Sequence, residues 1–176
     1  ALPIYYVRNS VKAVVDAYDG SVKLYQWDDK DPILKAWQKV FPGTVTPMSQ
    51  MSADLIAHMR YPEDLFNVQR TMMATYHVND AAEFYSGGDF WKIPDDPTTP
   101  GQDQQAPYYL TLKMPGQEQA SFSLSSAYII GGNTNRNVLT GFLAVDSETS
   151  PGTGKKGERS PSYGKLRLLE IGRAHV

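Results

Sequence analysis

Residues 9–43 constrain the fold of this 176-residue chain more than any other stretch. Within them, Asp19-Gly20 favours a two-residue type I′ turn, because that turn needs positive φ and glycine adopts positive φ at little cost. We therefore predict a β-hairpin in which Asp19-Gly20 forms the loop and Val15 lies beside Leu24. The segment contains no nucleophile, metal cluster or phosphate-binding loop, so it indicates a structure and no chemistry.

A capped helix follows the predicted hairpin. Asp31 is a good N-cap, because its carboxylate can accept hydrogen bonds from backbone N–H groups, and Pro32 fits the first helical position, where no donor is needed. Pro42-Gly43 ends the helical pattern. The apolar residues between these signals recur at helical spacing and form one face: Ile33, Leu34, Trp37, Val40 and Phe41.

The middle third of the chain carries further helix signals. Ser52 is placed to cap a short helix, which Pro62 ends, and Pro62 also opens a longer helix. Asp80 and Glu83 form a capping box for another. In the longer helix we expect the following residues to form the buried stripe: Leu65, Val68, Met72 and Tyr76.

Strand patterns dominate after residue 107. Apolar alternation and apolar runs predict strands at 108–114, 120–130, 138–146 and 165–170, with 138–146 in a central position. The predicted fold class is α+β, with an N-terminal β-hairpin, three to four helices in the middle third and a C-terminal antiparallel β-meander. We expect a single α+β domain over residues 1–170, with a flexible loop at 147–162 that is rich in Ser, Gly, Lys and Pro.

Composition narrows the classes of function. The formal net charge is −2, the pI is about 5.9, and no Lys/Arg stripe alternates with aromatic residues, so nucleic-acid binding has little support. The chain has no cysteine, which excludes disulfides, thiolate catalysis and Cys-ligated zinc. No run approaches the roughly 20 apolar residues that span a bilayer.

Two motifs resemble binding sites and fall short of them. Residues 152–156 read Gly-Thr-Gly-Lys-Lys, but Thr149 stands where a phosphate-binding loop needs glycine and Lys156 where it needs Ser or Thr. An acidic cluster lacks the alternating ligands, central Gly and distal Glu of a calcium loop, so we interpret it as a turn and a cap: Asp28, Asp29 and Asp31.

Histidines, aromatic residues and carboxylates leave an enzyme open as an alternative. His58 and His77 are too few for a metal site and fit helix ends. Large aromatic residues more often pack in the core or cover a sheet edge than line a ligand groove, and we expect the same of one aromatic cluster: Phe84, Tyr85, Phe90 and Trp91. In the enzyme hypothesis, Glu63 or Asp89 acts in a groove lined by Trp91. The sequence itself specifies no catalytic, cofactor-binding or metal-binding residue, and no cofactor.

Five phrases, in order along the chain, resemble one known family. They are residues 5–43 (beginning YYVRNSVKAVVDAYDG), residues 59–91 (beginning MRYPEDLF), PYYLTLKMPGQ at 107–117, NRNVLTGFLAVDS at 135–147 and YGKLRLLE at 163–170. The chain looks like part of an uncharacterised family of large multi-pass membrane proteins found in actinobacteria and cyanobacteria. Residues 147–162 depart from the family pattern, in which a shorter acidic link is expected.

The resemblance implies a cellular location for the chain, but it implies no catalytic or binding residues. It implies a fragment of a large extracytoplasmic region, attached to transmembrane helices in the cell membrane. The partner it implies is the remainder of the same membrane-embedded chain, while any envelope component or ligand is unknown. The family brings no established active site. Residues 171–176, IGRAHV, resemble a translated sequencing adapter, so we expect a non-native tail that includes His175.

Three hypotheses of function follow. The leading one is a binding or structural module in the extracytoplasmic domain of a multi-pass envelope protein, and a transport-associated role for the parent protein rests on the resemblance alone. The second is a hydrolase that acts on cell-envelope polymers. The third is a free-standing soluble binding protein.

Overall fold

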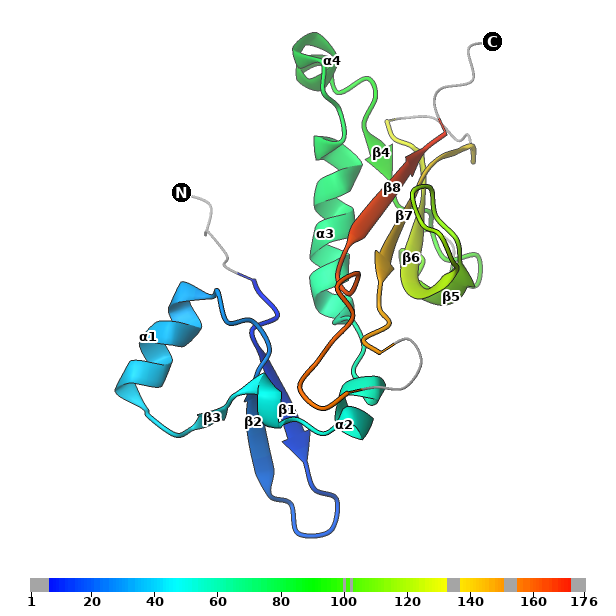
Figure 1. Cartoon of the computed structure of the whole chain (residues 1–176). Helices are drawn as coiled ribbons and strands as arrows, with labels where there is room; N and C mark the ends of the chain where they lie inside the picture. Colours follow the sequence, from blue (N-terminus) through cyan, green and yellow to red (C-terminus); the bar gives the residue numbers. More distant parts are fainter. Residues whose placement is uncertain (1–6, 100, 102, 133–136, 151–154, 172–176) are drawn as a thin grey trace. The chain divides into compact units, whose positions relative to one another are not determined.

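A computed structural model describes residues 7–99, 101, 103–132, 137–150 and 155–171 (Figure 1). The chain divides into two compact units. The first unit comprises residues 1–59 and 149–161, and the second comprises residues 60–148 and 162–176. Whether the two units act as the single domain expected over residues 1–170 stays a prediction.

The first unit is built on a three-stranded sheet. Strands β1 (Val11–Val15) and β2 (Val22–Gln26) pair antiparallel, and β3 (Val45–Thr46) pairs parallel to β2. Helix α1 (Pro32–Val40) makes the crossover from β2 to β3, and the short helices η1 (Met48–Gln50) and α2 (Ala53–His58) follow. The buried apolar side chains of this unit include Tyr25, Trp27, Leu34, Met51 and Ile56.

The hairpin is present, but the predicted register is wrong. Val15 pairs with Val22 rather than with Leu24, and the turn spans residues 16–21. Among the described residues only glycines have positive φ, so Asp19 does not adopt the conformation that a type I′ turn requires. The Asp16 carboxylate instead accepts a hydrogen bond from the Tyr18 amide (2.8 Å), and Asp19 does the same for Ser21 (2.8 Å). These side-chain bonds stabilise a wider turn.

Helix α1 begins and ends as its sequence predicts. Asp31 accepts a hydrogen bond from the Ile33 amide at 2.8 Å, and Pro32 is the first helical residue. The helix ends at Val40, with Phe41 as its C-cap, immediately before Pro42. The caps therefore fix where this helix lies in the sequence.

The second unit is an antiparallel sheet with helix α3 (Glu63–Tyr76) packed against it. Helix α4 (Ala81–Ser86) precedes strands β4 (Trp91–Lys92), β5 (Tyr108–Leu112), β6 (Ser121–Ile130), β7 (Leu139–Asp146) and β8 (Leu166–Glu170). The strand order is β4-β6-β7-β8, and β5 also pairs with β6. The α+β fold with a C-terminal antiparallel sheet is thus confirmed, and β7 lies inside the sheet as predicted. The core residues are Tyr61, Phe66, Ala74, Ile93, Leu124, Tyr128, Leu143 and Val145.

The buried face of α3 differs from the predicted stripe. Phe66, Arg70 and Ala74 are buried, whereas Val68 and Met72 are exposed. Arg70 can face the sheet because its guanidinium donates to the Gln105 carbonyl oxygen at 2.7 Å, which satisfies part of its polar surface. A buried arginine breaks the apolar periodicity on which the sequence prediction relied.

The predicted flexible loop at 147–162 includes residues 151–154, which lie outside the described residues. At its start, the Ser147 hydroxyl accepts a hydrogen bond from the Tyr61 amide at 2.8 Å in the second unit. Thr149 is buried in the first unit, where the Ser160 amide donates to its carbonyl at 2.6 Å. The ends of the segment are therefore held by specific contacts, and its flexibility stays a prediction.

Candidate functional site

Helix α1 presents an apolar surface that the described residues leave exposed. Leu34 is buried, but Trp37 is 58% exposed and Val40 66% exposed. The rings of Trp37 and Phe41 stack with centroids 5.3 Å apart. We call the exposed set of Ile33, Trp37, Val40 and Phe41 the α1 face. Single exposed apolar residues are ordinary, whereas contiguous ones mark interaction surfaces.

A groove of about 250 Å³ adjoins the α1 face within the first unit. It runs between the helix and strands β1, β2 and β3, and its walls are apolar apart from Gln38 and Thr44. The remaining lining residues are Val11, Leu24, Leu34, Trp37, Phe41 and Val45. Such a surface fits an apolar side chain of a partner better than a polar ligand.

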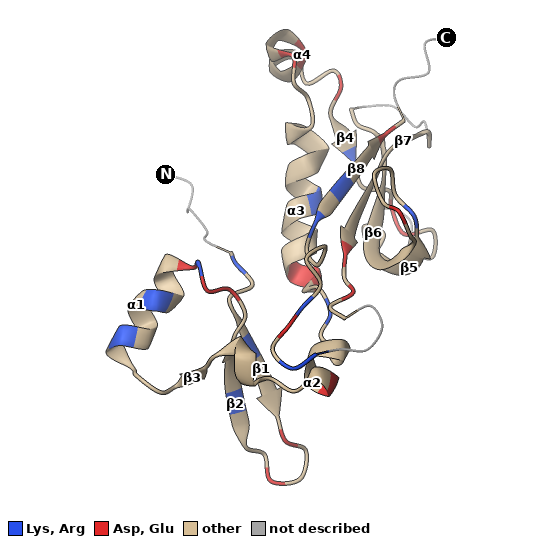
Figure 2. Ribbon diagram, in the orientation of Figure 1, with Lys and Arg blue, Asp and Glu red and all other residues tan. Residues whose placement is uncertain are grey.

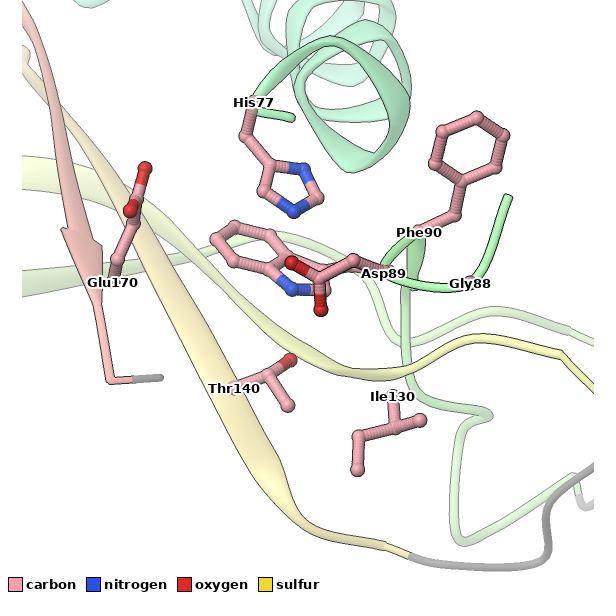
Figure 3. Close-up of a pocket in the computed structure, with 8 residues that line it drawn as sticks. His77, Gly88, Asp89, Phe90, Ile130, Thr140 and Glu170 are labelled. Carbon is pink, nitrogen blue, oxygen red and sulfur yellow. The ribbon is translucent and has the colours of Figure 1, made fainter. Parts of the chain in front are cut away.

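A second, smaller pocket of about 70 Å³ lies in the second unit (Figure 3). His77, at the end of α3, stacks on Trp91 of β4 with ring centroids 3.4 Å apart. Gly141 makes room for the indole, because a Cβ at that position would lie 2.5 Å from Trp91 Cζ3. We call this site the His77 pocket; its lining residues are His77, Gly88, Asp89, Phe90, Trp91, Ile130, Thr140 and Glu170.

The polar atoms of the His77 pocket are distinctive. His77 Nδ1 lies 2.9 Å from the Met73 carbonyl oxygen, to which it can only donate. His77 Nε2 is buried and has no hydrogen-bond partner among the described residues. Asp89, which precedes β4, and Glu170 of β8 also line this pocket (Figure 3). Buried unpaired polar atoms are uncommon in folded proteins, but other described residues, among them Asn67 and Arg167, also carry one.

The acidic cluster in the first unit acts as a turn and a cap. Arg8 makes an ion pair with Asp28 at 2.6 Å. Partial burial raises the pKa of Asp28, because it disfavours the ionised carboxylate. Hydrogen bonds from the Lys30 amide and the Arg8 guanidinium lower it by more, so the pKa of Asp28 lies below its ordinary value. Asp29 is exposed, and Asp31 caps α1.

The other candidate residues are dispersed. His58 belongs to the first unit, where its Nδ1 lies 2.6 Å from the Asp54 carbonyl oxygen, and Glu63 opens α3 in the second unit. Residues 152–154 of the Gly-Thr-Gly-Lys-Lys stretch lie outside the described residues, and Lys155 approaches Glu158 at 3.9 Å. Of the two carboxylates named in the enzyme hypothesis, Asp89 lines the His77 pocket and Glu63 does not.

The predicted aromatic cluster separates into packing and surface residues. Phe84 and Phe90 pack edge to face with centroids 5.4 Å apart, while Tyr85 is 94% exposed. Trp91 enters the His77 pocket. No sequence pattern indicates Thr140, Gly141 or Glu170, because only the pairing of β7 with β8 brings Glu170 opposite Gly141.

Charge, metal-binding geometry and helix length give three further observations. Figure 2 shows Lys and Arg spread over several elements of each unit and interspersed with Asp and Glu. In the part of the chain that the structure describes, no three His, Asp or Glu side chains are grouped to hold a metal ion. Within the same residues, no helix combines the length and apolar character that crossing a bilayer requires.

Comparison with known proteins assigns the chain to a protein family. The chain belongs to an uncharacterised protein family, and the family model described as "Uncharacterised protein family (UPF0182)" matches residues 2–176. A UPF0182 protein of Kocuria rhizophila is 55% identical over 184 residues, which cover 100% of this chain and 18% of the relative. One from Paenarthrobacter aurescens is 56% identical, covering 97% of this chain and 17% of the relative.

The chain therefore spans less than a fifth of the length of these relatives. A UPF0182 protein of Bifidobacterium adolescentis gives the same proportion, with 54% identity over 94% of this chain and 16% of the relative. The resemblance seen in the sequence is confirmed at the level of the family, and the chain corresponds to one segment of a much larger protein. No solved structure matches the chain significantly.

Proposed function

We propose that this chain is a binding or structural module in the extracytoplasmic region of a multi-pass cell-envelope membrane protein. In this proposal the α1 face docks on the remainder of the same polypeptide. The observation that carries the docking proposal is the exposure of the apolar side of α1, a helix whose caps are otherwise well formed. The extracytoplasmic and multi-pass placement rests on the family resemblance.

The remainder of the polypeptide is the occupant that the observations favour. More than four-fifths of each relative lies outside the matched region, so most of the surface available to this segment belongs to its own chain. The groove walls are apolar, as in interfaces that stay buried once formed. A second copy of the chain or a separate protein would need the α1 face to be accessible in the full-length protein.

The hydrolase alternative has weaker support. Asp89, Glu170 and Trp91 do share a pocket, but its volume of about 70 Å³ is small. Sites for drug-sized ligands typically measure about 300–1,000 Å³. A polymer-cleaving site would also need an open groove along which the polymer can lie.

A photo-crosslinking experiment tests the docking proposal. A benzophenone amino acid replaces Trp37 in the full-length protein, and the control replaces Tyr18, which is fully exposed in the hairpin turn. We expect position 37, but not position 18, to crosslink to a peptide of the same polypeptide outside this segment. A crosslink only to a second copy, only to another protein, or to nothing would overturn the proposal.

Cysteine labelling tests the placement. Because this segment has no cysteine, a single Tyr18→Cys substitution introduces one defined thiol into it. In intact cells of an otherwise cysteine-free full-length protein, we expect a membrane-impermeant maleimide to label that thiol. Labelling only after the cells are lysed would contradict an extracytoplasmic location.

A further inference from the structure

Helix α3 carries an apolar surface on the side opposite to its buried face. Val68, Met72 and Tyr76 recur every four residues along the helix, and each is between 43% and 64% exposed. They lie about 200° around the helix axis from the buried residues Phe66 and Arg70, which precede Val68 and Met72 by two positions. We call the exposed set of Val68, Met72 and Tyr76 the α3 face.

The α3 face lies in a stretch of helix that has no exposed charge. Between Leu65 and Asn79 the only Lys, Arg, Asp or Glu residue is Arg70, which is buried. The ring of Tyr76 also contacts that of Phe84 in α4, with centroids 5.7 Å apart, so the apolar surface continues beyond the end of α3. A helix side that faces water normally carries charged residues, whereas contiguous exposed apolar residues mark interaction surfaces. The α3 face therefore has the composition of a surface that another element covers.

Carboxylates stand at both ends of the α3 face. Glu63 and Asp64 form the first turn of α3, while Asp80 and Glu83 begin α4 (Figure 2). All four of these residues are exposed. An occupant with basic residues at the two ends of an apolar stretch would meet opposite charges here, and such complementarity fixes the register of an interface.

The same carboxylates disfavour two other occupants. Two copies of the chain packed through α3 would bring like charges together, because Asp64 would lie near Asp64 of the other copy in a parallel pair and near its Asp80 in an antiparallel pair. A membrane surface is anionic, and helices that lie on it are rich in Lys and Arg. A separate protein would have to compete with the rest of the same polypeptide, which makes up more than four-fifths of each relative.

From these observations we infer that the α3 face binds an apolar segment of the same polypeptide, outside residues 1–176, that carries basic residues at both ends. The apolar side chains of that segment cover Val68, Met72 and Tyr76, and its Lys or Arg side chains meet the acidic ends of α3 and α4. The inference goes beyond the proposed function, because it concerns the second unit and states the chemistry of the occupant. It can hold where the docking of the α1 face fails.

Methionine oxidation measures whether the α3 face is covered. The full-length protein and the 176-residue chain are treated with hydrogen peroxide in the same detergent, and mass spectrometry quantifies the sulfoxide at each methionine. Met51 and Met114 are 0% and 4% exposed, so their slow oxidation reports that a sample is folded. We expect Met72 to be oxidised rapidly in the 176-residue chain and about as slowly as Met114 in the full-length protein.

Photo-crosslinking identifies the occupant. A benzophenone amino acid replaces Met72 in the full-length protein, and the control replaces Glu118, an exposed residue in the turn between β5 and β6. We expect position 72, but not position 118, to crosslink to an apolar peptide outside residues 1–176 that has Lys or Arg on both sides. The product should migrate as a single chain, which distinguishes it from a crosslink between two copies. Val68 is the second position for the crosslinker where replacement of Met72 prevents folding.

Charge neutralisation tests the acidic ends. In the full-length protein at low ionic strength, Asp64→Asn combined with Glu83→Gln should speed the oxidation of Met72 about 2- to 30-fold, because each exposed ion pair changes an equilibrium constant by about 1.4- to 5-fold. Glu118→Gln removes a carboxylate away from the α3 face and should leave the oxidation rate unchanged.

Several results would overturn the inference. One is rapid oxidation of Met72 in the folded full-length protein, and another is an unchanged oxidation rate in the double variant. A crosslink from position 72 to residues 1–176, to a second copy, to another protein or to lipid would also contradict it. The same holds for a crosslinked segment without basic residues, or for no crosslink in the folded protein.

Discussion

The substitution Gly141→Ala tests the packing around Trp91. A Cβ at position 141 would lie 2.5 Å from Cζ3 and 2.7 Å from Cη2 of the indole. The stacked imidazole of His77, with its centroid at 3.4 Å, and the ring of Tyr128, at 5.3 Å, limit where the indole can move. The new methyl group must therefore displace a rigid ring or the strand itself.

Two opposing effects set the magnitude. Replacing glycine by alanine within an ordinary strand stabilises the fold by about 0.5–1 kcal/mol. Overpacking a core costs about 1–3 kcal/mol, and the rigid ring places this site in the upper part of that range. We expect net destabilisation of about 1–2 kcal/mol, or a fall in Tm of roughly 5–15 °C for a unit of about 100 residues.

The assay is thermal and urea unfolding of the 176-residue chain, followed by circular dichroism. Gly88→Ala is the matched control, because its nearest neighbour is the flexible Ser86 hydroxyl at 3.3 Å and its backbone suits any residue. It should change stability by less than about 0.5 kcal/mol. In a Trp91→Leu background the cost of Gly141→Ala should largely disappear. A neutral or stabilising Gly141→Ala, or an equal cost in both backgrounds, would refute the reasoning.

Two further predictions concern the core and a half-buried lysine, Lys12. Phe66→Ala removes a fully buried ring and should cost about 3–5 kcal/mol in urea unfolding, whereas Val68→Ala on the exposed side of α3 should change stability by less than about 0.5 kcal/mol. Equal costs would contradict the buried face described above. Burial, and to a smaller extent the nearby Arg159 guanidinium, lowers the pKa of Lys12 to about 8. Between pH 8 and 10.5 the unfolded chain therefore binds more protons than the folded chain, and the free energy of unfolding rises with pH. Lys12→Met should be more stable than wild type at pH 7, and that advantage should shrink towards pH 10.5; a constant difference in Tm would contradict it.

Local signals in the sequence predicted the elements well. The caps at Asp31 and Asp80 placed α1 and α4, because an N-cap acts through backbone amides two or three residues away. Strand periodicity placed β5 to β8, with β7 inside the sheet. These signals need no knowledge of the rest of the fold.

Competing local hydrogen bonds and tertiary contacts explain why the predicted hairpin register and the predicted buried face of α3 are wrong. The hairpin register depended on carboxylates at Asp16 and Asp19, which bond to the turn and displace the two-residue loop. In α3, Arg70 occupies the buried face because the Gln105 carbonyl, 35 residues away, accepts its hydrogen bond. No periodicity could indicate that partner.

The His77 pocket was only partly visible in the sequence. The enzyme hypothesis names Glu63 or Asp89 in a groove lined by Trp91, and of these two carboxylates Asp89 lines the pocket with Trp91. Glu170 joins them through the pairing of β8 with β7, and the orphaned Nε2 of His77 depends on the stacking of its ring. Sites assembled from several strands require the register before they can be recognised.

Hydroxyl-radical footprinting of the 176-residue chain and of the full-length protein tests the docking of the α1 face most directly. Trp27, which is 3% exposed, provides a buried reference in the same unit, and Tyr85 provides an exposed one. The isolated chain is also measured in the detergent used for the full-length protein. We predict that Trp37 is modified rapidly in the isolated chain and as slowly as Trp27 in the full-length protein, while Tyr85 reacts equally in both. Rapid modification of Trp37 in the full-length protein would contradict the proposed docking.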